Sequence, residues 1–104
     1  MKAFLLSSVT VFALSLSSFA SAASIDSREA WQRERIAHGV ADGCLNRHEA
    51  ARLTARENAI ARREAFYRST GYGLSRGERY DLQRRLDWAS AAIAREAHDS
   101  RGCR

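Results

Sequence analysis

The amino-acid sequence predicts an all-α protein, a small three-helix domain running up, down and up after a cleaved signal peptide. The chain contains no proline, and it is rich in alanine, arginine and glutamate while lacking the alternating β-branched runs typical of strands. Glycines interrupt this helix-forming composition near residues 43 and 71–73, and a helix-start pattern follows each interruption. We therefore expect helices over 27–41, 47–68 and 76–98.

The N-terminal segment has the three parts of a secretory signal. Lys2 supplies a positive charge, residues 3–19 form an uncharged apolar run, and residues 20–22 (Ala-Ser-Ala) are the small residues that signal peptidase requires. We predict a signal peptide over 1–22, a single helical domain over 23–104, and a periplasmic or secreted location. The alternative is an uncleaved membrane anchor, which the serines within the run disfavour. No stable membrane insertion is expected after cleavage.

The chain is basic, with 17 Lys and Arg against 12 Asp and Glu and a formal net charge of +5. Lys2 is the only lysine, so the predicted domain carries its positive charge on arginine. Acidic residues precede many arginines at helical spacing: Glu29 and Arg33, Glu49 and Arg52, Glu64 and Arg68, Asp81 and Arg85. Such pairs predict solvated, ion-paired helix faces, with a weak and salt-screened attraction to anionic surfaces.

The first helix is expected to begin at Asp26 or Ser27, because short polar side chains cap the free amides of a helix N-terminus. Its large apolar residues are Trp31, Ile36 and Val40, and we expect them to face the core.

The second and third helices begin with the same capping box. Asn46 stands three positions before Glu49, and Ser75 stands three positions before Glu78. In this pattern the short side chain accepts the amide of the acidic residue, whose carboxylate bonds back to the amide of the cap residue. The four residues therefore predict where both helices start. Gly43, and either Gly71 or Gly73, are expected to end the preceding helices.

The buried faces follow from the spacing of the apolar residues. On the third helix, a regular stripe comprises Leu82, Leu86, Ala89 and Ile93. On the second helix, the seam is less regular and includes a charged residue: Ala50, Leu53, Glu57, Ile60 and Tyr67. We also expect Phe66 and Trp88 in the core.

The two helix starts form a weak internal repeat, in which Leu45, Arg47, Glu49 and Leu53 recur 29 residues later. The alternative is that two ordinary helix caps have similar sequences by chance. The pattern over 34–99 resembles small secreted proteobacterial helical proteins of unknown function with tandem D-G-x-L-T-x-x-E-x-x-x-L units. This chain departs from those units with Asn46 and Ser75 in place of threonine, and with Gly71-Tyr72 in place of the second Asp-Gly. The resemblance implies no activity.

The first of these turns also has a degenerate, ligand-poor resemblance to the second half of an EF-hand loop. Gly43, Leu45 and Glu49 match loop positions six, eight and twelve. The first and third positions fall on His38 and Val40, which lack the carboxylates that calcium requires. We therefore expect no calcium binding.

Cys44 and Cys103 are the only cysteines, and both follow the predicted signal peptide. An up-down-up arrangement returns the end of the third helix to the start of the second, and an exported protein meets an oxidising environment. We therefore predict an intramolecular disulfide between Cys44 and Cys103. An intermolecular bridge and two free thiols are the alternatives.

The same arrangement gathers all three histidines, His38, His48 and His98, at one end of the bundle. Imidazoles bind transition metals, so these residues are candidate metal ligands. Histidines near helix C-termini also interact favourably with the helix dipole, and the spacing matches no metal motif, so the main expectation is that no metal is bound.

No nucleophile elbow, glycine-rich phosphate loop or paired carboxylate motif occurs, so we expect no enzyme, no catalytic residue and no cofactor. The main hypothesis is an exported structural, interaction or envelope-stress protein that presents charged helical faces to a protein or envelope partner. The alternative is a periplasmic transition-metal-binding or metal-responsive protein. A third hypothesis is a binder of anionic envelope polymers. Nothing predicts a specific nucleic-acid site or an oligomeric state.

Overall fold

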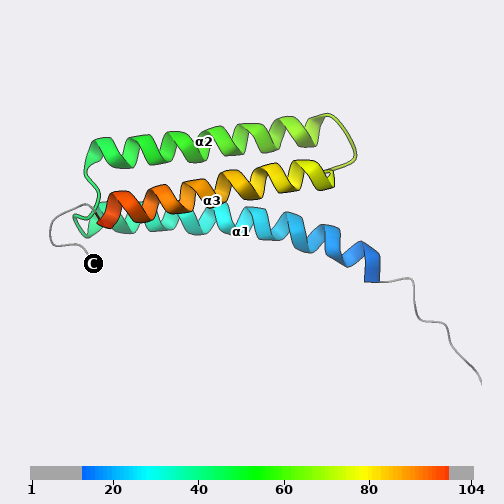
Figure 1. The fold of residues 1–104 in the computed structure, drawn as a ribbon, viewed down its shortest axis with the longest axis horizontal. Coiled ribbons are helices and arrows are strands. Elements are labelled where there is room, and N and C mark those ends of the chain that lie inside the picture. Colours follow the sequence, from blue (N-terminus) through cyan, green and yellow to red (C-terminus); the bar gives the residue numbers. More distant parts are fainter. Residues whose placement is uncertain (1–12, 99–104) are drawn as a thin grey trace, which may run out of the picture.

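The computed structural model describes residues 13–98, with side chains described for residues 24–97, and it confirms the all-α up-down-up architecture (Figure 1). The helices are α1 (Ala13–Ala41), α2 (Arg47–Ser69) and α3 (Arg76–His98), and the described part contains no strand. Each helix packs against the other two. The end of α1, the start of α2 and the end of α3 lie together at one end of the bundle.

Helix α1 begins earlier than the sequence indicates, so the predicted start at Asp26 or Ser27 is wrong for this chain. The helix runs unbroken from Ala13, and both residues lie exposed in its interior. The stretch before Asp26 contains no glycine or proline that would stop it. Ile25 is fully buried against α3, which holds this part of α1 on the bundle.

The first 12 residues lie outside the described part of the chain, so the signal peptide over 1–22 stays a prediction. Within the described helices, none combines the length and the hydropathy needed to cross a bilayer.

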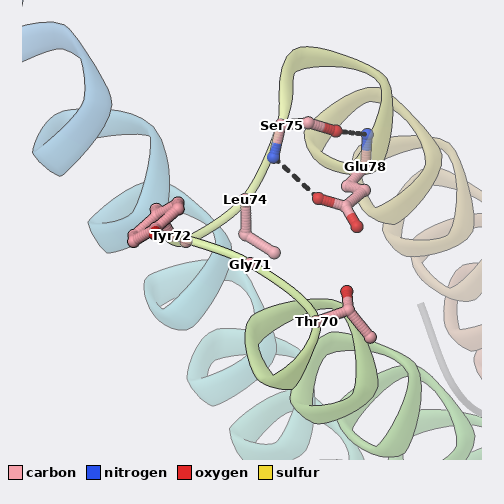
Figure 2. Close-up of a pocket in the computed structure, with 7 residues that line it drawn as sticks. Thr70, Gly71, Tyr72, Leu74, Ser75 and Glu78 are labelled. Atoms are coloured by element: carbon pink, nitrogen blue, oxygen red, sulfur yellow. Dashed lines mark hydrogen bonds between the residues drawn. The ribbon is translucent and has the colours of Figure 1, made fainter.

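Both capping boxes form in the structure. Asn46 Oδ1 accepts the Glu49 amide at 2.8 Å, and the Asn46 amide donates to Glu49 Oε1 at 2.9 Å. At the start of α3, Ser75 Oγ accepts the Glu78 amide at 3.1 Å, and the Ser75 amide donates to Glu78 Oε1 at 2.8 Å (Figure 2). These reciprocal bonds satisfy amides that a helix N-terminus leaves without partners, and so they fix where α2 and α3 begin.

Glycine conformations and one close contact shape the two turns. Gly43 and Gly73 have positive φ angles of 77° and 103°, which identifies Gly73 rather than Gly71 as the left-handed residue of the second turn. In the first turn, the amides of Cys44 and Leu45 both donate to Gly39 O, at 2.8 and 2.9 Å. The turn therefore folds back on the last part of α1.

The core consists of two apolar clusters stacked along the bundle. One cluster contains Ile25, Ile60, Leu82, Leu86 and Ala89. The other lies toward the turn between α1 and α2 and contains Ile36, Leu45, Leu53, Ala92 and Ile93. The stripe predicted on α3 is thus the buried side of that helix. Between the clusters, α1 and α2 bury the polar side chains of Gln32 and Glu57, which are 2% and 1% exposed.

Three predicted core positions are wrong on α1 and α2. Trp31 and Phe66 are each 62% exposed, and Val40 is 49% exposed. On α1, the positions that face the other helices are Ile25, Gln32 and Ile36, so the inward stripe contains polar residues and the tryptophan falls outside it.

Candidate functional site

Helices α2 and α3 expose large aromatic side chains on their outer sides. Phe66 is 62% exposed, Tyr80 is 65% exposed and Trp88 is 54% exposed, so the expectation that Trp88 belongs to the core is also wrong. Leu86 and Ala89 take the buried positions beside it on α3, which leaves Trp88 just outside the stripe. Exposed rings of this size often mark interaction surfaces.

Arg84 joins two of these rings. It lies one helical turn after Tyr80 and one turn before Trp88, so the three side chains share one side of α3. The guanidinium carbon of Arg84 is 4.8 Å from the centre of the Trp88 ring and 5.9 Å from the centre of the Tyr80 ring. Both distances are within the range of a cation–π interaction.

Helix α2 contributes the other part of this surface. One shallow hollow is lined by Ala59, Arg62, Arg63 and Phe66 of α2. A second hollow lies between the two helices and is lined by Arg56, Ala59, Ile60, Arg85 and Trp88. Ala59 lines both hollows, and its small side chain makes the surface continuous from α2 to α3. We call this surface the arginine–aromatic face, made of Arg56, Ala59, Arg62, Arg63, Phe66, Tyr80, Arg84, Arg85 and Trp88.

The face carries an excess of positive charge. Among the described residues, the arginines at 56, 62, 63 and 84 have no carboxylate oxygen within 4.0 Å. Arg85 is ion-paired with Asp81, with Nε 2.9 Å from Oδ2. The four guanidiniums without a carboxylate partner can form charge-assisted hydrogen bonds with an external anion.

Asp81 is the acidic residue at the edge of this face, and the structure keeps it ionised. The Tyr67 hydroxyl donates to Asp81 Oδ2 at 2.5 Å. This hydrogen bond, followed by the bond and charge of Arg85, lowers the pKa of the Asp81 carboxyl below its usual value. The charge of Arg63 also contributes to this shift, so Tyr67, Arg85 and Arg63 together offset the negative charge of Asp81, whereas Arg56, Arg62 and Arg84 do not contribute.

The histidine candidates are brought to one end of the bundle, but the two described side chains point to no metal centre. His38 is in the last turn of α1 with 71% of its side chain exposed, and its Nε2 lies 3.9 Å from Glu34 Oε1. His48 is exposed in the first turn of α2. Neither belongs to a group of three potential ligands among the described residues. His98 ends α3, and its side chain lies outside the described part.

Cys44 lies partly buried in the turn between α1 and α2, at the end of the bundle where α3 finishes. Cys103 lies outside the described residues. The arrangement of the helices meets the condition for the predicted disulfide, and the pairing itself stays a prediction.

A cluster of carboxyl groups occupies the contact between α1 and α2. Asp26, Glu29 and Glu64 each place an oxygen within 4.8 Å of the others, and Glu64 also bonds Arg68 at 3.0 Å. Burial raises the pKa of Glu29 to about 7, with further contributions from its hydrogen bond to Glu64 and from nearby carboxylates. Glu29 therefore gains or loses its proton close to neutral pH.

Glu57 also lies in the contact between α1 and α2. In the row of buried residues on α2, it immediately precedes Ile60. Both of its carboxylate oxygens are buried and have no hydrogen-bond partner among the described residues. Burial raises the pKa of Glu57, and the charge of Arg33 opposes that shift. Burial of a carboxyl without a hydrogen-bond partner costs folding free energy, so we expect this side chain to destabilise the core.

Comparison with known proteins provides no relative from which to transfer a role. No family model matches the chain, and searches of curated proteins and of solved structures return no match. A functional assignment therefore depends on the chemistry of the surfaces described above.

Proposed function

We propose that this chain is an exported interaction protein, not an enzyme, that binds an anionic, phosphate-bearing partner of the cell envelope through the arginine–aromatic face. The observation that carries the proposal is the group of arginines without carboxylate partners beside exposed aromatic rings. Arginine presents a planar fork of donors that matches phosphate oxygens, and it keeps its charge at all physiological pH values.

The helical framework supports this role. The face spans two helices that pack against each other and against α1, so its guanidiniums and rings are held on rigid elements rather than on a loop. Its hollows are shallow and open, as expected for contact with an extended surface or polymer rather than with an enclosed small molecule.

Association with long-chain polyphosphate tests the proposal. We expect binding that weakens steeply as salt is added, because bound phosphates release counterions. In the double variant Arg63→Ala/Arg84→Ala, affinity should fall and the salt dependence should become shallower. The log–log slope should become smaller in magnitude for each phosphate that the variant no longer neutralises, by an amount of the same order as the roughly 0.7 per phosphate seen with single-stranded nucleic acids.

The matched control is Arg33→Ala/Arg47→Ala, which removes the same charge from α1 and from the first residue of α2. This control should keep most of the affinity. Equal losses of affinity in the two double variants would mean that net charge alone drives binding, and the assignment of the face would fail. Melting temperatures of all variants establish that each remains folded.

A further inference from the structure

The exposed aromatic residues of α2 and α3 extend from the middle of α3 to the turn that joins the two helices. Phe66 is in the last two turns of α2, Tyr72 is fully exposed in the connecting turn (Figure 2), and Tyr80 and Trp88 lie on α3. Phe66 and Trp88 line the two shallow hollows beside Ala59 and arginines, and Tyr80 stands beside Arg84. A polyanion that contacts only the guanidiniums would leave these rings in water.

Phosphate binding alone explains the arginines but gives no reason for the rings. Tryptophan and tyrosine are favoured at the boundary between lipid headgroups and hydrocarbon, where an apolar ring and a polar edge are both accommodated. Arginine is favoured there as well, because its stem covers apolar surface while its guanidinium reaches the phosphates. The Tyr80–Arg84–Trp88 row combines both kinds of side chain within two helical turns.

The shape of the surface also favours a planar partner. The rings project from the outer sides of two adjacent helices, and the hollows between them are shallow. A bound peptide or nucleotide would instead require a groove or pocket that encloses it. A flat face of exposed rings and arginines is suited to a lipid surface, where the rings can reach the depth of the headgroups.

We infer that the phosphate-bearing partner is the surface of an anionic phospholipid membrane, on which the face lies with Phe66, Tyr80 and Trp88 at the level of the headgroups. This inference rests on the proposed function, and it adds the identity of the partner and a role for the rings. The arginines contact lipid phosphates, and the rings enter the interface.

Trp88 provides a direct readout of this contact. The protein is recovered after export, its N-terminus is defined by intact mass, and Trp31→Phe leaves Trp88 as the only tryptophan. With vesicles of phosphatidylcholine and phosphatidylglycerol, we expect a blue shift of Trp88 emission and quenching by lipids brominated near the headgroup. Vesicles of phosphatidylcholine alone should give a much smaller shift, because the arginines then lack an anionic surface.

Two tryptophan variants separate the face from the rest of the molecule. Trp88→Ala should weaken binding to anionic vesicles by about tenfold, the expected effect of losing one ring from an apolar environment. Trp31→Ala is the matched control: Trp31 is 62% exposed against 54% for Trp88, but it lies on α1 beside Glu34, Arg35 and His38, outside the arginine–aromatic face, and its loss should have little effect. Intact mass verifies that the compared variants share one N-terminus, so a difference between Trp88→Ala and Trp31→Ala reports the position of the lost ring.

The outcomes distinguish this inference from the proposed function. Arginine-dependent binding to polyphosphate without binding to anionic vesicles would overturn the inference and leave the function standing. Vesicle binding that Trp88→Ala does not weaken would also overturn it, because the rings would then have no part in the contact. Failure to bind either anion would overturn both proposals.

Discussion

Leu45 packs so closely on Gly39 that a β-carbon at residue 39 would lie 2.6 Å from Leu45 Cδ1 and 2.8 Å from Leu45 Cγ. The same pair is joined through the backbone, since the Leu45 amide donates to Gly39 O at 2.9 Å. Leu45 is 3% exposed, so its side chain has little space in which to move away. The first turn therefore depends on the absence of a side chain at residue 39.

Replacing Gly39 by alanine should lower the free energy of unfolding by about 1–3 kcal/mol, as overpacking of a filled core does. Gly77→Ala is the control, because a β-carbon at residue 77, in the first turn of α3, would meet no atom within 4 Å. That substitution should be neutral or slightly stabilising, since alanine has the higher helix propensity. Chemical denaturation measures both changes. An unchanged stability in Gly39→Ala would contradict the close-packing argument.

Glu57→Met should stabilise the protein by about 1–3 kcal/mol. The substitution exchanges a buried carboxyl without hydrogen-bond partners for an apolar side chain of similar length. Leu53→Ala, one turn earlier on the same seam, should have the opposite effect and cost about 2–5 kcal/mol. A loss of stability in Glu57→Met would mean that the carboxyl has a partner that stabilises it.

Stability should fall as pH rises from about 5 to about 8. Glu29 has a pKa raised to about 7 in the folded protein, because it is buried and lies near Glu64, Asp26 and Glu57. The folded state therefore holds a proton that the unfolded state releases near pH 4.5. This contribution is complete below the unfolded-state value and disappears as pH passes through the folded-state value. The raised pKa of Glu57 acts in the same direction.

The melting temperature measured across this range tests the prediction. Asp81 and Glu96 have lowered pKa values in the folded protein. Their contributions to stability are therefore lost only at pH values below this range, and they do not oppose the predicted trend. Glu29→Gln mimics the protonated form and should flatten the profile. If the melting temperature of Glu29→Gln falls with pH as steeply as that of the unchanged protein, another titrating group must cause the pH dependence.

The predicted disulfide should be intramolecular and stabilising. Closing a loop of this length restricts the unfolded chain by roughly 4 kcal/mol in the entropy model. Reduction should lower the melting temperature sharply, and Cys44→Ser should reproduce the change. Intact-mass measurement after alkylation without reductant is the direct test. Labelling of both thiols in the exported protein would contradict the pairing.

Zinc, copper or nickel at low concentration should leave the melting temperature almost unchanged. A ligand that binds only the folded state stabilises it by about 2.7 kcal/mol at a hundredfold excess over its dissociation constant. His38 and His48 are exposed and belong to no three-ligand group in the described part of the chain. A large rise in melting temperature with one of these metals, abolished by His48→Ala, would favour the metal-binding alternative instead.

The helix starts at Asn46 and Ser75 could be predicted because a capping box is a local signal carried within four residues. The start of α1 could not, because no stop signal precedes Asp26 and the packing of Ile25 against α3 is a tertiary effect. The same limit applies to Trp88, whose exposure depends on how α3 is rotated against its neighbours.

The arginine–aromatic face could not be predicted from spacing, because spacing pairs each arginine with the nearest acid along its helix. Arg68 and Arg85 do pair one turn back along their helices. Arg33 instead bonds Asn58, and Arg52 pairs with Glu96 on α3. Their expected partners have other roles, because Glu29 lies in the carboxyl cluster and Glu49 caps α2. Sequence spacing does not show which carboxylates form other interactions in the folded protein.

The burial of Ile25 has a consequence for the proposed cleavage of the signal peptide. This residue lies three positions after the proposed cleavage site at residue 22 and contributes to the apolar cluster with Leu82 and Leu86. A cut one helical turn later would remove it and leave part of the core open to water. Signal peptidase would then determine how stable the released protein is, as well as whether it is released. Forms of the protein that begin before and after Ile25 should therefore differ in thermal stability.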